Sequence, residues 1–159
     1  MATMHVDLDA LKRPHWSAEE LGHAALIADF VQHLMNEHDF DYVMRTFGGH
    51  AYVQHNRGLP DGLEGLTEFL RRFVGRFPEY GYDVKRILVD GDTVMFHSHV
   101  TTKASHRGDD TKGFNIVDTW RIQDGTIADH WDAIQPLDGF MRLYVWLTGG
   151  AIRNANGVF

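Results

Sequence analysis

The sequence predicts one α+β domain in which helices come first and a run of antiparallel strands follows. Apolar residues recur at helical spacing as far as Phe77. After Gly81 they alternate, in segments separated by turn sequences such as Asp124-Gly125. Helices followed by hairpin-connected strands are typical of a curved antiparallel sheet with the helices packed on one side. The length of 159 residues suits a single domain.

The amino-acid composition argues against several classes of function and partner. The formal net charge is −7 and no run of Lys and Arg exists, so we expect no nucleic-acid partner. The chain has no cysteine, which excludes disulfides, thiol catalysis and thiolate metal sites. No secretory signal and no membrane-spanning apolar run are visible in the sequence, so we expect no membrane partner and a cytoplasmic location.

Three helices are predicted in the first half of the chain. Residues 1–16 form an N-terminal arm that we expect to be irregular. The first helix begins after Ser17, which forms a capping-box pattern with Glu20, and ends near 36–38. Asp39 caps a second, short helix that stops at two glycines. A third helix is predicted over 63–77 from its apolar stripe.

The second half of the chain predicts a sheet. A short extended piece covers 50–56. Strands are predicted at 82–89, 93–103, 113–123 and 126–134. We assign residues 17–136 to the main α+β unit and 137–159 to a C-terminal extension of the same domain. The extension contains a short amphipathic helix, whose expected apolar face is Phe140, Leu143, Tyr144 and Leu147, and a tail.

The last strand carries a histidine and a carboxylate on one face. His130 and Asp132 are two residues apart, so both side chains leave the strand on the same side, with Trp131 and Ile134 beside them. A carboxylate on an apolar wall loses hydration, which raises a carboxyl pKa toward the range where it exchanges protons near neutral pH. Alternatively, both residues are exposed on an edge strand or pair with an arginine.

A second carboxylate, Asp118, lies on the apolar face of the preceding strand. Its neighbours on that face are Phe114, Ile116, Trp120 and Ile122. Burying a carboxylate there is costly unless it is paired or protonated. We therefore regard Asp118 as a candidate site residue beside Asp132, with a salt bridge to Arg45 or Arg121 as the structural alternative.

Hydrogen-bonding residues gather where the extended piece meets a loop. Gln54, His55 and Asn56 follow Tyr52 and are typical of a pocket rim. His55 could act as an acid or base, or could simply cap loop backbone. Aromatic residues are expected to bind substrate and exclude water together with Tyr52 and Asn56. They are Trp120, Trp131, Phe96 and Phe73.

His97 and His99 form a His-x-His pair on one strand. The other face of this strand is more apolar and should point inward, which leaves the histidines outside or at a subunit contact. In the opposite phase they could form a three-ligand metal site with His55, or with His130 or Asp132. The chain also has no glycine-rich phosphate loop, no dinucleotide fingerprint and no His-Glu-x-x-His motif. We expect no metal and no cofactor.

Several of these segments resemble one family. They are Tyr52–Asn56, Asp61-Gly62, Asp90–Val94 with His97 and His99, Asp124–Asp132, and Gln135-Pro136. Together they look like the SnoaL-like proteins of the nuclear-transport-factor-two-like superfamily. The resemblance covers about 21–136, and the ending 156–159 also looks familial. It implies a cystatin-like α+β roll, a cone of curved mixed sheet with three N-terminal helices on its concave face. It also implies a homodimer through the open sheet face.

The resemblance also implies an activity. Polyketide cyclases of this group close a ring by an intramolecular aldol reaction without a cofactor, and their acid/base aspartate matches Asp132. The neighbouring position, a histidine in those cyclases, is Asp118 here. Two neighbouring carboxylates raise the pKa of one of them, which also suits the opening of an epoxide by water.

Three hypotheses follow from these residues. The first is a cofactor-independent cyclase, lyase or isomerase acting on a small, mostly apolar carbonyl compound, with Asp132 as base and His55 or protonated Asp118 as hydrogen-bond donor. The second is an epoxide hydrolase. The third is a non-catalytic protein that binds a small apolar ligand.

Overall fold

A computed structural model describes residues 3–149 and 153–156, so the predicted chain end at 157–159 lies outside the described residues. One mixed sheet has the strand order β1-β5-β4-β3-β2, in which β1 is parallel to β5 and the other pairs are antiparallel. The strands are β1 Val53–Gln54, β2 Gly81–Asp90, β3 Thr93–Thr101, β4 Phe114–Gln123 and β5 Thr126–Pro136. The helices are α1 Leu8–Leu11, α2 Ala18–Val31, α3 Phe40–Phe47, α4 Gly62–Arg76 and α5 Gly139–Thr148.

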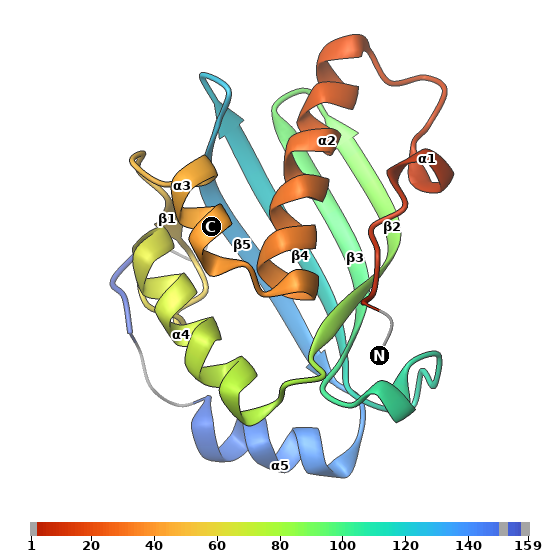
Figure 1. Ribbon diagram of the computed structural model, residues 1–159, viewed down its shortest axis with the longest axis vertical. Coiled ribbons are helices and arrows are strands. Elements are labelled where there is room, and N and C mark those ends of the chain that lie inside the picture. Colours follow the sequence, from red (N-terminus) through yellow and green to blue (C-terminus); the bar gives the residue numbers. More distant parts are fainter. Residues whose placement is uncertain (1–2, 150–152, 157–159) are drawn as a thin grey trace.

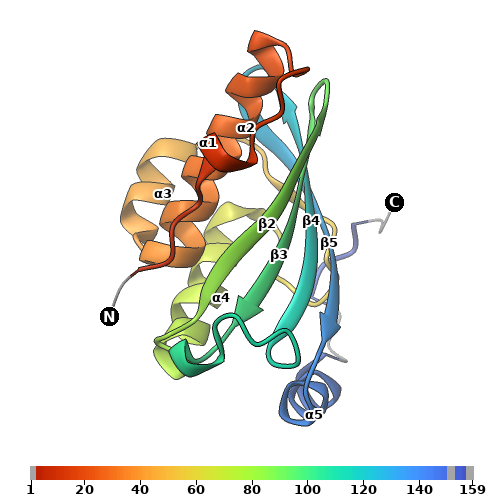
Figure 2. The ribbon, with the colours of Figure 1, turned by 90° about the vertical axis from the view of Figure 1, so that its right-hand side faces the viewer.

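The helices lie on one side of the sheet. Helices α2, α3 and α4 cover one face, and no described helix covers the other (Figures 1 and 2). Alternate residues of β3 make the core beneath them, and Val94, Phe96 and Val100 have no exposed surface. This arrangement confirms the predicted α+β fold with three helices packed on one face of a mixed sheet.

The predicted helix starts are confirmed by their caps. The Ser17 hydroxyl accepts from the Glu20 backbone N–H, and the Glu20 carboxylate accepts from the Ser17 backbone N–H. Helix α2 continues into a π-helical turn, Gln32–Glu37, and the segment stops at His38 with a left-handed φ of 58°. Asp39 then caps α3 through the Tyr42 backbone N–H.

The N-terminal arm differs from the expectation of an irregular segment. It contains α1, a helix of four residues that is capped by the Asp7 side chain. Just before it, Val6 is buried and its backbone N–H donates to the Gln32 side chain. Contact with α2 therefore orders a segment whose own sequence carries only a weak helical signal.

The rotation of α5 also differs from the expectation. Met141 is its buried residue, and Tyr144 packs against Phe73 and Phe77 of the body. The stripe expected to be buried is instead largely exposed, and Trp146 is exposed as well. The exposed large side chains of α5 are Phe140, Leu143, Trp146 and Leu147. Spacing alone could not distinguish these faces because α5 is apolar on most of its circumference.

Among the described residues, none of the helices combines the length and the hydropathy that crossing a bilayer requires.

Candidate active site

A pocket of about 160 Å³ lies between the sheet and helices α4 and α5. Aromatic side chains from both layers contribute to its mostly apolar wall. They are Phe69, Phe73, Tyr80, Tyr82, Phe114 and Tyr144. A closed apolar cavity of about this size can take a molecule with a single six-membered ring. The pocket therefore fits a small apolar ligand.

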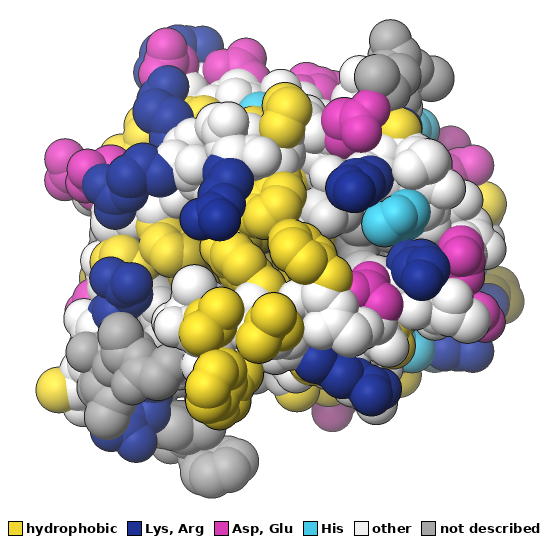
Figure 3. Space-filling model, turned by 90° about the horizontal axis from the view of Figure 1, so that it is seen from below, with side chains coloured by type: hydrophobic (Ala, Val, Ile, Leu, Met, Phe, Trp, Pro, Cys, Tyr) yellow, Lys and Arg dark blue, Asp and Glu magenta, His cyan; other side chains and the backbone are white. Residues whose placement is uncertain are grey.

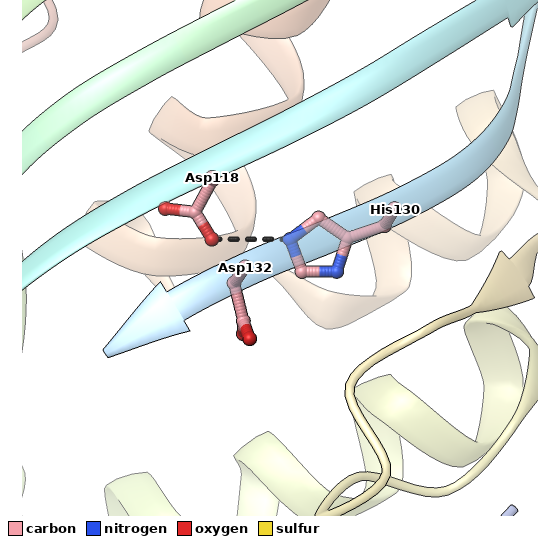
Figure 4. Close-up of side chains that lie close together, drawn as sticks. All are labelled: Asp118, His130 and Asp132. Carbon is pink, nitrogen blue, oxygen red and sulfur yellow. Dashed lines mark hydrogen bonds and ion pairs between the residues drawn. The ribbon is translucent and has the colours of Figure 1, made fainter. Parts of the chain in front are cut away.

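Three titratable side chains converge in this apolar pocket. Asp118 comes from β4, and His130 and Asp132 come from β5 (Figure 4). Asp118 and Asp132 are register partners across the two strands, and His130 shares the inner face of β5 with Asp132 because they are two residues apart. One ligand atom from each side chain lies within 4.8 Å of the other two.

His130 and Asp118 share a hydrogen bond that is hidden from water. His130 Nε2 lies 3.0 Å from Asp118 Oδ1, and the two side chains are 3% and 2% exposed. Asp118 thus has neither of the arginine partners considered from the sequence, since Arg121 pairs with Asp129 on the outer face of the sheet.

Gln54 fixes which nitrogen of His130 carries a proton. Gln54 Oε1 lies 2.9 Å from the backbone N–H of Asn56, a group that can only donate, so this end of the amide is the oxygen. The same oxygen lies 3.1 Å from His130 Nδ1, which must therefore carry a hydrogen and donate it. A single proton then lies between His130 Nε2 and Asp118 Oδ1.

Asn56 orients the second carboxylate. Its amide Nδ2 lies 2.6 Å from Asp132 Oδ1 and 2.8 Å from Asp132 Oδ2. Its own Oδ1 accepts from the Gly58 backbone N–H, which fixes the amide orientation. Asp132 is half-buried, so it is held in place while it remains open to the pocket.

Burial controls the protonation of Asp118 and of the nearby tyrosines. Loss of hydration raises the pKa of the Asp118 carboxyl, against the opposing effect of its hydrogen bond to His130. Burial also raises the pKa of the hydroxyls of Tyr52, Tyr80 and Tyr82. The three phenols therefore stay protonated at neutral pH, and Asp118 is disposed to hold a proton.

Three aromatic residues that were expected to bind substrate instead pack around His130 in the core. The Trp120 ring stacks on His130 with a centroid distance of 5.3 Å, and Phe96 lies against Trp120 at 5.4 Å. The Tyr52 ring is 6.2 Å from the His130 ring. Of the expected aromatic residues, Phe73 lines the pocket itself, whereas these three form the packed layer that fixes the imidazole.

The structure does not bring His55 and Trp131 to the pocket. Their rings stack on each other at 4.4 Å, and His55 Nε2 lies 2.9 Å from Asp129 Oδ1. Trp131 and Asp129 have the opposite parity to His130 in β5, so their side chains leave the other face of the sheet. His55 follows them there, and its expected role as donor to a substrate oxygen has no geometric support.

The His-x-His pair also lies on the outer face. His97 Nε2 is 2.6 Å from Asn115 Oδ1, and His99 Nε2 is 2.8 Å from the Lys112 carbonyl. The candidate metal set of His55, His97 and His99 is therefore not assembled. Among the described residues, the group whose ligand atoms could meet on a metal ion is Asp118, His130 and Asp132.

Some residues of the site and of the pocket wall were not predicted from the sequence. Gln54 was placed on the rim but not in the site, although it shares strand parity with Tyr52 and Asn56 and has no exposed surface. That parity was a usable signal. Tyr80 and Tyr82 gave no such signal, because aromatic residues at the start of a strand are equally common in any core.

Comparisons with known proteins place this geometry in a family. A crystal structure of a candidate polyketide cyclase from Bacillus cereus ATCC 10987 is 21% identical, with a TM-score of 0.63, covering 88% of this chain and 89% of that one. A candidate isomerase of the SnoaL-like family from Agrobacterium tumefaciens str. C58 is 16% identical, with a TM-score of 0.55, covering 72% and 97%. No curated protein matches the chain.

The fold is shared more widely. A cystatin-fold protein from Novosphingobium aromaticivorans is 19% identical, with a TM-score of 0.53, covering 74% of this chain and 99% of that one. At these identities the structural matches establish the fold alone, and they confirm the cystatin-like architecture expected from the sequence. The family model described as "SnoaL-like domain" matches residues 27–130, the segment that contains Asp118 and His130. The chain therefore belongs to the SnoaL-like family.

Proposed function

We propose that the protein is a cofactor-independent acid/base enzyme acting on a small, mostly apolar carbonyl compound, in a reaction of the aldol cyclase, lyase or isomerase type. The observation that carries this proposal is the convergence of Asp118, His130 and Asp132 in an otherwise apolar pocket. The names of the similar structures, a candidate polyketide cyclase and a candidate isomerase, support the same type of reaction.

Each of the three side chains has a role that its contacts suggest. Asp132 is open to the pocket and oriented by Asn56, so it removes a proton from the carbon next to the carbonyl. The proton held between Asp118 and His130 is offered to the carbonyl oxygen as negative charge develops there. Gln54 keeps His130 in the tautomer that this step requires.

Proton exchange tests the proposal without knowledge of the product. One-ring ketones and β-keto esters are incubated with the protein in D2O, and loss of the α-proton signal is followed by NMR. We expect exchange with at least one compound, and a loss of about 100-fold or more in Asp132→Asn, since general bases contribute about 10²–10⁴-fold.

A matched variant controls for the loss of one carboxylate. Asp124→Asn makes the same chemical change in a turn remote from the pocket, where the φ of 52° is one that asparagine accepts. It should exchange at the wild-type rate. Unchanged exchange in Asp132→Asn would refute its role as base, and binding without any exchange would favour a non-catalytic ligand-binding protein.

The register of the two carboxylates favours one alternative reaction. Asp118 and Asp132 are directly opposite each other on neighbouring strands, an arrangement that can position and deprotonate a water molecule for attack on an epoxide. Reaction in ¹⁸O-labelled water distinguishes the two proposals, because a hydrolase incorporates the label into a diol.

A homodimer through the outer sheet face is part of this proposal. None of the described helices covers that face (Figure 2). Half-buried residues on it include Met95, Val117 and Trp131. Light scattering during gel filtration should give twice the chain mass, and Val117→Lys should give a monomer. A wild-type monomer at every concentration would refute the dimer. The cytoplasmic location stays a prediction, which immunoblotting of cell fractions would check.

A further inference from the structure

The pocket opens on the side of the molecule that carries α5. Ile134 lines the pocket and is nevertheless 44% exposed, and the half-buried Tyr144 forms another part of the same wall. Viewed from this side, hydrophobic side chains gather in the middle of the surface, and several Lys and Arg side chains lie around them with Asp and Glu side chains in between (Figure 3). The mouth is therefore apolar, with charged side chains of both signs around it.

Two arginines contact rings that line the pocket. The Cζ atom of Arg76 lies 5.7 Å from the centre of the Tyr144 ring. The Cζ atom of Arg153 lies 6.0 Å from the centre of the Phe69 ring. Tyr144 and Phe69 both line the pocket, and both arginines are exposed. Cation–π contact holds each guanidinium near the mouth while its N–H groups stay available.

Neither arginine has a carboxylate partner among the described residues, in contrast to the other arginines of α4. Arg71 pairs with Asp41 at 3.2 Å, and Arg72 pairs with Glu68 at 2.6 Å. The formal net charge of the whole chain is −7. Two guanidinium groups that have no acidic partner within residues 3–149 and 153–156 form a local site of positive potential at the mouth of the pocket.

The inner end of the pocket has the opposite character. The Asp132 carboxylate lies there beside the Asp118–His130 pair, which is neutral because it shares one proton, so an anionic group is repelled from the interior by Asp132 and attracted to the mouth. A ligand with one apolar part and one anion can therefore bind in only one orientation. The volume of about 160 Å³ limits the enclosed part to about one ring.

We propose that the pocket takes an amphiphilic acid, whose apolar, one-ring-sized part enters the pocket and whose carboxylate stays at the mouth, where the guanidinium groups of Arg76 and Arg153 attract it. This inference rests on the proposed function for the carbonyl group at the inner end. The anion site itself rests only on the placement of the two arginines. Guanidinium groups suit this role because they donate two parallel hydrogen bonds to a carboxylate.

Binding of two probes of equal shape tests the anion site. Phenylbutanoate and phenylbutanamide differ in charge but hardly in size, and isothermal titration calorimetry at low salt gives both affinities. We expect the acid to bind about three- to ten-fold more tightly than the amide, a range set by exposed ion pairs, and added salt to reduce the ratio. Phenylbutyl phosphate, used as a third probe, shows whether the mouth prefers a phosphate to a carboxylate, and a phosphate preference would overturn the assignment of a carboxylate.

Matched variants locate the effect. Arg76→Gln and Arg153→Gln should each lower the acid-to-amide ratio, and the double variant should bring it near one. Arg72→Gln removes an arginine of the same helix that already has a partner, so it should keep the wild-type ratio. Equal affinities in the wild type, an equal loss in Arg72→Gln, or no binding of either probe would overturn the proposal.

The test also separates this inference from the proposed function. Asp132→Asn should keep the preference for the acid, because the anion site does not include Asp132. A protein that prefers the acid but shows no α-proton exchange would refute the proposed function and leave the anion site standing. A protein that exchanges the α-protons of carbonyl compounds but shows no preference for the acid would refute the anion site and leave the proposed function standing.

Discussion

The substitution Asp118→Asn replaces a titratable carboxyl in the interior by an amide while it keeps the shape of the side chain. Asp118 is 1% exposed, and burial raises the pKa of its carboxyl above the ordinary value of 3.8. The amide of the variant can donate to His130 Nε2, because Gln54 holds the imidazole hydrogen on Nδ1. The hydrogen bond of 3.0 Å can therefore survive the substitution.

The raised pKa determines the sign of the pH dependence. Below pH 3.8 the carboxyl is protonated in both the folded and the unfolded chain, and it adds no pH dependence. As the pH rises from there to the folded-state pKa, the unfolded chain releases the proton first, so the wild type loses stability. Above the folded-state pKa the loss is constant, at about 1.4 kcal/mol for each unit of the shift. Asp118→Asn lacks this titration, so it should gain stability relative to the wild type as the pH rises.

A second substitution provides the comparison. Asp118→Ala leaves His130 Nε2 without a partner in a place where its side chain is only 3% exposed, so water cannot replace the carboxylate. An unpaired buried acceptor costs about 1–3 kcal/mol. At neutral pH the alanine variant should therefore be the least stable of the three proteins.

Urea denaturation at several values between about pH 4 and about pH 8 measures these differences. The free energy of unfolding of Asp118→Asn minus that of the wild type should increase with pH. A difference that decreases with pH would mean that ionised Asp118 stabilises the fold through an ion pair with His130, and it would refute the raised pKa of Asp118.

Three further predictions concern the fold and the support of the site. Gly113→Ala should lower the free energy of unfolding by about 2–5 kcal/mol, since φ is +76° and the new Cβ would lie 2.2 Å from the Val100 carbonyl oxygen of β3. Gly91→Ala has a φ of +58° but no atom within 4 Å of the new Cβ, so it should lower the free energy of unfolding by only about 1–2 kcal/mol. Equal melting temperatures of the two variants would contradict this difference. Asn156→Ala removes hydrogen bonds of 2.8 Å to the Gln54 carbonyl and 2.9 Å to Asp61 Oδ1, which lie at the two ends of the loop that contains Asn56. It should therefore lower the free energy of unfolding by about 1–2 kcal/mol and speed amide exchange in that loop, whereas unchanged exchange would argue against a supporting role. Met141→Ala should lower the free energy of unfolding by about 2–5 kcal/mol because the Met141 side chain is buried. Trp146 is 77% exposed, so Trp146→Ala should change the free energy of unfolding by less than about 0.5 kcal/mol. A larger loss in Trp146→Ala than in Met141→Ala would mean that α5 packs through its other face.

Local chemistry made much of the fold predictable. Capping residues such as Ser17 and Asp39 mark helix starts because their side chains satisfy backbone N–H groups a few residues away. Strand parity likewise placed His130 and Asp132 on one face, because alternation depends only on the local backbone. The helix at 8–11 escaped prediction because contact with α2 orders it.

Within the site, the residue types followed from the sequence but their partners did not. The sequence determined that two carboxylates and a histidine lie on apolar strand faces, and it indicated the family. It did not determine that Gln54 holds His130, that Asn56 holds Asp132, or that His55 lies on the outer face. These contacts join residues about 75 positions apart, and they exist only because β1 pairs in parallel with β5. Periodicity reports the direction of a side chain from its own strand, whereas its partner is decided by long-range strand pairing and by the packing of the helices against the sheet.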